Sequence, residues 1–193
     1  MNTNLANADW EEKSRIERIN GKAVMMSPRP AVNHNQAAYN IATIFAVYLK
    51  GKPCRPFQDG TDLYLNEENQ FIPDFMVVCD PDKIKPNGVY GAPDLVAEVL
   101  SPGTIRNDRT YKKDAYARCG VREYWLVSPA EKSVEIYRLD NGDLILSDIY
   151  ALHQDWELAQ MNDEERAAVV TRFKCSLFDD LDISLEDIFY RIF

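Results

Sequence analysis

Residues 91–128, GAPDLVAEVLSPGTIRNDRTYKKDAYARCGVREYWLVS, contain the pattern that decides the fold. We expect a strand over residues 94–100, and side chains two apart on a strand share one face. Glu98 then shares its face with Val96 and Leu100, inside a run that should otherwise be buried. A buried carboxylate needs a cation, a hydrogen-bond partner or a metal. Glu98 is therefore the first candidate site residue.

A basic helix and a second strand are expected after Glu98. Thr104 or Asn107 can cap the helix, and Gly120 suits its C-terminal end. One stripe of this helix contains three residues spaced by four, Asp108, Lys112 and Tyr116. Residues 123–128 alternate as a half-buried strand. The strand–helix–strand order suggests a crossover unit and leaves the strand directions open.

Composition indicates a globular protein without a membrane partner. The chain has 193 residues, 46% hydrophobic and 27% charged, which predicts one domain over residues 1–193. We expect a core at about 15–150 and a C-terminal extension at about 151–193. No apolar run approaches the roughly 18 residues of a membrane span. The polar, acidic N-terminal stretch does not resemble a signal peptide. A cytoplasmic location is expected.

The cysteines and histidines narrow the classes of metal site. Cys54, Cys79, Cys119 and Cys175 are scattered without a CxxC pair, which predicts reduced thiols and no zinc knuckle. The chain has only two histidines, which excludes a multi-histidine metal site.

The net charge of −9 and the pI of about 4.8 argue, taken alone, against a nucleic-acid partner. Six basic residues nevertheless fall between the two strands of the opening stretch: Arg106, Arg109, Lys112, Lys113, Arg118 and Arg122. Two interpretations stay open, an ordinary solvated helix face and a local patch that faces phosphate.

Turn signals divide the rest of the chain. Asn20-Gly21 predicts a hairpin between residues 15–19 and 22–26, and a proline-rich break at 27–30 precedes a helix over 32–50. His34 lies in the first turn of that helix, where it either caps and packs or points into a site. Further expected elements are strands at 54–58, 61–65 and 71–78, a loop at 80–90, and a hairpin of 133–139 with 143–150 about Asn141-Gly142. The last ones are a helix within 156–170, an irregular or extended 173–183, and a helix over 185–193 opened by a capping box of Ser184 and Asp187.

Asp74, Glu98 and Lys112 together resemble the outline of a PD-(D/E)xK nuclease site. In that site two carboxylates hold Mg²⁺, which prefers oxygen ligands, and a lysine offsets charge at phosphorus. This chain has Leu100 where the lysine of the plain motif stands. A lysine on the following helix can occupy the same volume, and Lys112 is the candidate.

More of the chain resembles one family. PDLVAEVLSPGT, then Asp108 and Lys112, then AYARCGVREYWLVSP, are similar to the signature of the Uma-two family of restriction-endonuclease-like proteins with a migrated lysine. IPDFMVV, the proline-rich break followed by His34, and LEDIFYRIF extend the resemblance. It implies an α/β (α+β) restriction-endonuclease-like core, with a central mixed β-sheet flanked by helices, an N-terminal hairpin and a C-terminal helix.

The resemblance also implies roles for individual residues. Asp74 and Glu98 would be metal ligands for Mg²⁺, with Mn²⁺ as an alternative ion, and Lys112 would be the catalytic lysine. His34 would orient water or phosphate beside them. Asp94 and Asp108 match family positions without a defined role.

Three functions remain open on the sequence. The first is a Mg²⁺-dependent endonuclease that hydrolyses DNA, although DNA and RNA are not distinguished. The second is an inactive nuclease-fold protein that binds nucleic acid or another protein. The third is a hydrolase of a smaller phosphate ester. Cutting two strands favours two-fold symmetry, so a homodimer is compatible with the first function.

Overall fold

The structure is a computed structural model that describes residues 16–25 and 30–193. The outer ends of the predicted hairpin, at 15 and 26, and most of the proline-rich break lie outside these residues. A central six-stranded sheet has the order β12-β11-β10-β9-β6-β3. Its strands are β3 (Arg55–Gln58), β6 (Phe75–Val78), β9 (Leu95–Val99), β10 (Glu123–Ser128), β11 (Ser133–Asp140) and β12 (Asp143–Ala151). β9 and β10 are parallel and the other neighbours antiparallel, so the sheet is mixed.

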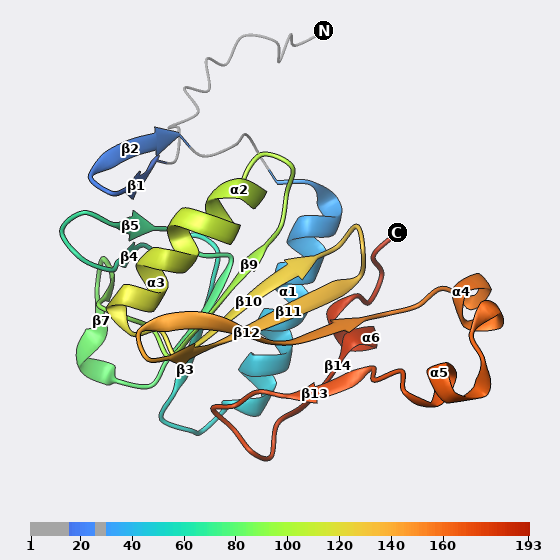
Figure 1. Cartoon of the computed structure of the whole chain (residues 1–193). Helices are drawn as coiled ribbons and strands as arrows, with labels where there is room; N and C mark the ends of the chain where they lie inside the picture. The colour runs from blue at the N-terminus through green and yellow to red at the C-terminus, as the bar shows by residue number, and fades with distance from the viewer. Residues whose placement is uncertain (1–15, 26–29) are drawn as a thin grey trace, which may run out of the picture.

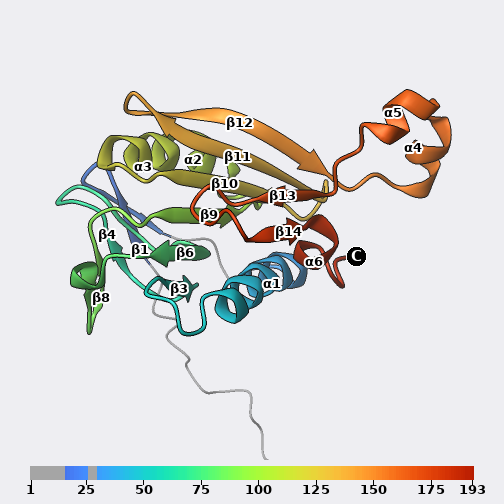
Figure 2. The same cartoon turned by 90° about the horizontal axis from the view of Figure 1, so that it is seen from below.

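Helices cover both faces of this sheet, as Figures 1 and 2 show. On one face lies α1 (Val32–Tyr48), joined by α6 (Leu185–Ile188) and the small pair β13 (Arg172–Lys174) and β14 (Asp182–Ser184). The other face carries one continuous helical segment: α2 (Ile105–Asn107), the π-helical turn η2 (Asp108–Lys112) and α3 (Lys113–Cys119). This is the mixed α/β architecture that the family resemblance implies.

A second sheet lies beside α3, in the order β2-β1-β5-β4-β8-β7. Its strands are β1 (Ile16–Ile19), β2 (Lys22–Met25), β4 (Leu63–Tyr64), β5 (Gln70–Phe71), β7 (Ile84–Lys85) and β8 (Gly88–Tyr90). A 3₁₀ turn, η1 (Pro81–Lys83), precedes β7. The predicted loop at 80–90 is therefore partly wrong, because β7 and β8 pair in it as a short hairpin. Asn20-Gly21 and Asn141-Gly142 both turn with positive φ, as a tight hairpin requires.

Alternation along β9 assigns its side chains to two cores. Leu95, Ala97 and Val99 pack with α1, whereas Val96 packs with α3. Glu98 shares the face of Val96, as expected, and is buried there. The strand thus places a carboxylate between the sheet and the helix that contains Lys112.

The helix caps differ from the sequence prediction. Neither Thr104 nor Asn107 caps the α2–α3 segment through its side chain, because the helical path runs on through both ends of η2. Gly120 does end α3, with φ 90°. Ser184 caps α6 by accepting from the Glu186 N–H rather than in a box with Asp187.

The C-terminal extension differs in its elements. The helix expected within 156–170 is two short helices, α4 (Asp155–Gln160) and α5 (Asp163–Ala167), which stand away from the body (Figure 2). The helix expected over 185–193 ends at Ile188. Positive φ at Arg191 then turns the chain, and Ile192 packs into the core below α1.

Cys54 and Cys79 form a disulfide, so the prediction that all four cysteines are reduced is wrong for this pair. The β3–β6 register aligns Arg55 with Val78, and its continuation brings the two cysteines face to face. Sequence spacing does not reveal such a register. Cys119 and Cys175 are free thiols. Among the described residues, no helix has both the length and the apolar character of a membrane span.

Candidate functional site

Glu98 and Lys112 meet between the sheet and the α2–α3 segment. Lys112 Nζ lies 3.2 Å from Glu98 Oε1, and the two side chains are only 4% and 3% exposed. Tyr116, one turn further along, donates its hydroxyl to the same oxygen at 2.8 Å. The spacing of four thus brings both helix side chains onto Glu98, as the sequence stripe predicts. The π turn ends at Lys112, and such turns are frequent at functional sites.

Two further carboxylates surround the same ammonium. Glu17 Oε1, from β1, lies 3.0 Å from Lys112 Nζ. Asp108 Oδ1, one turn before the lysine, lies 3.4 Å away and makes no hydrogen bond with the described residues. All of these side chains are nearly inaccessible. One buried cation therefore faces three buried carboxylates, an arrangement that leaves negative charge in excess.

Asp74 and His34 form the neighbouring part of the site. Asp74 immediately precedes β6, and the β6–β9 register of Phe75 with Ala97 continues to place Asp74 across from Glu98. Asp74 Oδ2 accepts the Val99 N–H at 2.7 Å and lies 3.3 Å from His34 Nε2. His34 Nδ1 is buried and has no hydrogen-bond partner among the described residues. The four candidate residues thus form two contacting pairs on adjacent strands and helices.

Burial and the shared lysine set the protonation of the site. Burial raises the pKa of Glu98 well above its ordinary value; Lys112 opposes the rise, and Asp108, Asp74 and Glu17 add to it. Burial likewise raises the pKa of Asp108. For Lys112, burial acts to lower the pKa, but the three carboxylates outweigh it and hold the pKa well above its ordinary value. Lys112 therefore stays charged while Glu98 takes up a proton readily.

His34 carries a related shift. Burial lowers its pKa, but the hydrogen bond to Asp74 and the charges of Asp74 and Asp59 reverse this, and the net pKa is raised above 6.5. The imidazolium is thus favoured beside the carboxylates.

Asp74 and Glu98 offer carboxylate oxygens, the kind of donor that Mg²⁺ prefers. The contacts of described residues with Glu98 fall on Oε1, and those with Asp74 fall on Oδ2. One oxygen of each carboxylate is therefore left for a cation. No group of three or more His, Cys, Asp or Glu residues in the described chain is arranged to hold a metal. Mg²⁺ commonly takes only one or two carboxylates, with water and substrate phosphate supplying the rest.

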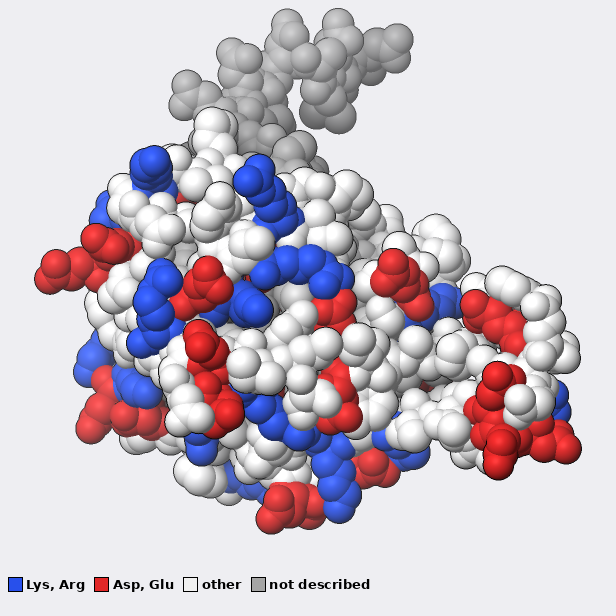
Figure 3. All heavy atoms as spheres, in the orientation of Figure 1, with Lys and Arg blue, Asp and Glu red and all other residues white. Residues whose placement is uncertain are grey.

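Two more of the six basic residues are paired with carboxylates of the fold. Arg109 makes two hydrogen bonds to Glu135 of β11, at 2.8 and 2.5 Å. Arg122 pairs with Asp94, which also accepts the Cys79 N–H and so ties β6 to β9. Figure 3 shows basic and acidic side chains interspersed over this face. Asp94 therefore stabilises the contact between the segments that flank β6 and β9. Of the six basic residues, Arg109 and Arg122 already have carboxylate partners.

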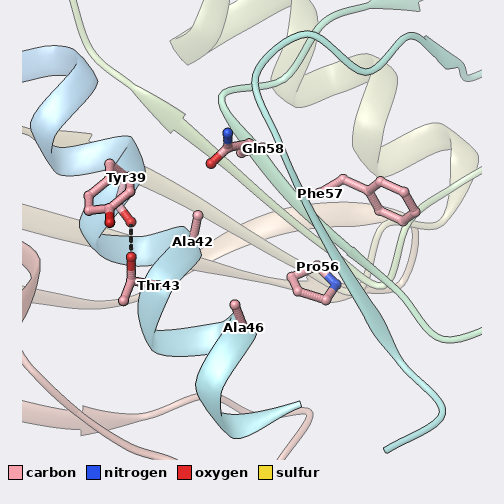
Figure 4. Close-up of a pocket in the computed structure, with 7 residues that line it drawn as sticks. All are labelled: Tyr39, Ala42, Thr43, Ala46, Pro56, Phe57 and Gln58. Atoms are coloured by element: carbon pink, nitrogen blue, oxygen red, sulfur yellow. Dashed lines mark hydrogen bonds between the residues drawn. The ribbon is translucent and has the colours of Figure 1, made fainter. Parts of the chain in front are cut away.

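An apolar groove of about 290 Å³ lies elsewhere, between α1 and β3 (Figure 4). It is lined by Tyr39, Ala42, Thr43, Ala46, Pro56, Phe57 and Gln58. It contains none of the four candidate residues. The candidate site and the apolar groove are therefore separate.

Glu17 is not among the residues predicted from the sequence, and Asp108 has no predicted role there. A signal for Glu17 exists, because in IERI the glutamate shares its face with Ile19, and both are buried. It is the same misfit that singles out Glu98. The contact with Lys112 depends on how the hairpin docks, which no local pattern specifies.

Comparisons with known proteins agree with this fold. The family model Uma2, described as "Putative restriction endonuclease", matches residues 6–167. The uncharacterized protein slr1290 of Synechocystis sp. (strain ATCC 27184 / PCC 6803 / Kazusa) is 32% identical over 142 residues, which are 71% of this chain and 74% of that protein. A crystal structure of a "putative nuclease belonging to DUF820" from Anabaena variabilis ATCC 29413 has a TM-score of 0.67 and 20% identity, covering 90% of this chain and 89% of that one. At that identity the likeness shows the fold. The family match extends over most of the chain, and we conclude that the protein belongs to the Uma2 family of restriction-endonuclease-like proteins.

Proposed function

We propose that the protein is a Mg²⁺-dependent endonuclease that hydrolyses phosphodiester bonds in DNA. The observation that supports this most is the contact of Glu98 with Lys112, 3.2 Å apart, next to Asp74, which immediately precedes the neighbouring strand β6. Family membership supports nuclease chemistry in general. The metal, the substrate and the residue roles are our proposal.

Each side chain has a role in this proposal. Asp74 and Glu98 would each give one oxygen to the ion, which when bound polarises the phosphate and lowers the pKa of a bound water. Lys112 holds a fixed positive charge where negative charge develops on the phosphate oxygens. His34, oriented through Nε2 by Asp74, presents a buried Nδ1 that can orient water or phosphate. Mn²⁺ is expected to replace Mg²⁺.

A second candidate is a nuclease-fold protein that binds without cutting. It is favoured by the enclosure of Lys112, whose ammonium three carboxylates already engage. A net charge of −9 also opposes tight binding of a polyanion. In this case the buried cluster would serve stability alone.

A cleavage assay on supercoiled plasmid with Mg²⁺ or Mn²⁺ separates the two. We expect nicking by the native protein, its loss in EDTA, and its loss in Asp74→Asn, Glu98→Gln and Lys112→Met. Asp143→Asn and Lys50→Met alter exposed residues and should keep activity. Nicking that survives all three site variants would place the activity elsewhere, and no nicking by folded native protein would favour the binding module.

The same assay with other substrates tests which class of phosphate ester the protein cleaves. Single-stranded RNA in the same assay tests the preference for DNA, and a small phosphodiester tests the third function that the sequence leaves open. Binding of duplex DNA should weaken steeply with salt, because counterions are released from the phosphates, whereas a small ester should show little change. We also propose a homodimer, which light scattering of the purified chain would test.

A further inference from the structure

The N-terminal hairpin reaches the centre of the site through one side chain. In β1, Glu17 and Ile19 are buried while Ile16 and Arg18 face outward. Glu17 Oε1 lies 3.0 Å from Lys112 Nζ, the shortest of the three ion pairs that the lysine makes with described residues. The closest carboxylate to Lys112 among the described residues therefore comes from a hairpin that is far from Lys112 in the sequence.

The carboxylate of Glu17 is itself held in place. Its Oε1 accepts the backbone N–H of Ile72 at 3.0 Å, two residues before Asp74. The tight turn at Asn20-Gly21 is anchored as well, since Asn20 N–H donates to Asn69 Oδ1 at 2.9 Å. Antiparallel pairing of Arg18 with Gln70 adds a third attachment. The Glu17 carboxylate is thus hydrogen-bonded to the segment between β5 and Asp74.

The three carboxylate partners of Lys112 differ in how well each can hold the ammonium in a fixed position. Asp108 lies on the same helix, four residues before the lysine, and moves with it. Glu98 is the residue that a metal would engage, and a cation there competes with the lysine for its charge. Glu17 is the one partner of the three that meets both conditions: it lies on a different element from Lys112, and it is not needed as a metal ligand. It is therefore the partner that can hold the ammonium in place while Glu98 turns to the ion.

We infer that Glu17 is a positioning residue for Lys112, which sets where the ammonium lies relative to the scissile phosphate. This inference rests on the proposed function, because it assigns Lys112 its place in phosphodiester hydrolysis. Misplacing a catalytic group by about 1 Å can cost on the order of 100-fold in rate. The expected loss for a Glu17 variant is accordingly about 10- to 100-fold in the single-turnover rate of cleavage.

Glu17→Gln is the decisive variant, because glutamine keeps an oxygen that accepts from Ile72 N–H and loses the charge that faces Lys112. Glu68→Gln, an exposed carboxylate in the loop beside the hairpin turn, is the matched control. We expect a slower rate at saturating DNA with an unchanged KM and unchanged Mg²⁺ dependence. Glu17→Ala should be slower still and should recover partly with added formate, which can enter the vacated space and restore a negative charge.

A second readout does not depend on cleavage. Acetylation of the metal-free protein by an N-hydroxysuccinimide ester, followed by peptide mass spectrometry, reports how tightly each lysine is held. Lys112 should be protected in the native protein and in Glu68→Gln and should become labelled in Glu17→Gln. Lys85 is exposed and should be labelled in every protein.

The outcomes separate this inference from the function on which it rests. A native rate and a protected Lys112 in Glu17→Gln would overturn the positioning role while leaving the nuclease intact. If Glu17→Gln cleaves more slowly because it needs more Mg²⁺, and Lys112 is still protected, the positioning role is overturned and Glu17 is a metal ligand instead. A third outcome is that the native protein cuts no DNA, while Lys112 is labelled in Glu17→Gln and protected in the native protein. This would refute the nuclease and still support Glu17 as the residue that holds Lys112 in place.

Discussion

Replacement of Lys112 by methionine tests the charge balance of the buried cluster. Methionine keeps most of the aliphatic stem, so the main loss is the ammonium and its three ion pairs, at 3.0, 3.2 and 3.4 Å. Removing one partner of a buried ion pair typically costs about 3–5 kcal/mol, because the other charge is left without compensation. We take this range for Lys112→Met in the metal-free protein at pH 8.

Urea denaturation followed by tryptophan fluorescence measures the effect. With a slope of about 2 kcal/mol per molar urea, a loss of 3–5 kcal/mol lowers the midpoint by about 1.5–2.5 M. Lys50→Met, at an exposed lysine, should shift it by less than about 0.25 M. The deficit of Lys112→Met should be smaller at pH 5 than at pH 8, because burial raises the pKa of Glu98 and of Asp108, and these two carboxyls no longer need a cation once they bind protons.

A double variant identifies the charge that is left unpaired. Adding Glu98→Gln to Lys112→Met removes one buried carboxylate and keeps an oxygen for the Tyr116 hydroxyl. We expect recovery of about 1 kcal/mol or more, within the range of coupling energies for contacting residues. The reasoning is refuted if Lys112→Met unfolds at the native midpoint at pH 8, because the carboxylates would then be hydrated rather than compensated by the lysine.

Three further predictions concern the surrounding structure. Glu123→Ala should lower the free energy of unfolding by about 2–4 kcal/mol, since this buried carboxylate accepts hydrogen bonds from Trp125 and Ser176, and amide exchange should speed up in residues 173–184. His34→Gln should cost more stability at pH 5.5 than at pH 8.5, because a raised folded pKa contributes stability below pH 6.5 that is lost as pH rises through it; equal losses at both pH values would contradict this. Reduction of the disulfide, which spans a separation of 25 residues, should lower stability by about 3 kcal/mol. Alkylation without reductant is done on the urea-unfolded chain, since Cys175 is buried in the folded protein, and should label two of the four cysteines; four labelled cysteines would show that the bond is absent.

Local signals in the sequence predicted the elements that lie nearest the chemistry. The strand at residues 123–128 has its predicted bounds, although all of its residues are buried rather than half of them, and the Asn-Gly turns identify both hairpins. Alternation placed Glu98 on the correct face, and the spacing of four placed Lys112 and Tyr116 beside it. These features depend on side-chain periodicity, which a sequence displays directly.

The features of the fold and the site that the sequence does not predict depend on contacts between distant segments. The parallel pairing of β9 with β10 follows from the crossover and not from either strand, and the cysteine pair follows from the β3–β6 register. The pairing of Glu17 with Lys112 requires the hairpin to dock beside β5. The loop at 80–90 contains two very short strands, and the Pro and Gly residues in and around them favour a loop in the sequence rather than a pair of strands.

The return of the chain to α1 has a consequence for its synthesis. Asn40, in the middle of α1, donates to the carbonyls of Ile188 and Tyr190, and Ile192 packs in the same core. α1 leaves the ribosome early, whereas the residues that cover this part of it are made last among those seen here. The part of α1 that contacts residues 188–192 thus stays uncovered until those residues are made, and surface exposed in this way makes a partly folded chain prone to aggregation. Translational pausing before residues 181–192 should therefore favour aggregation of this protein more than pausing after them.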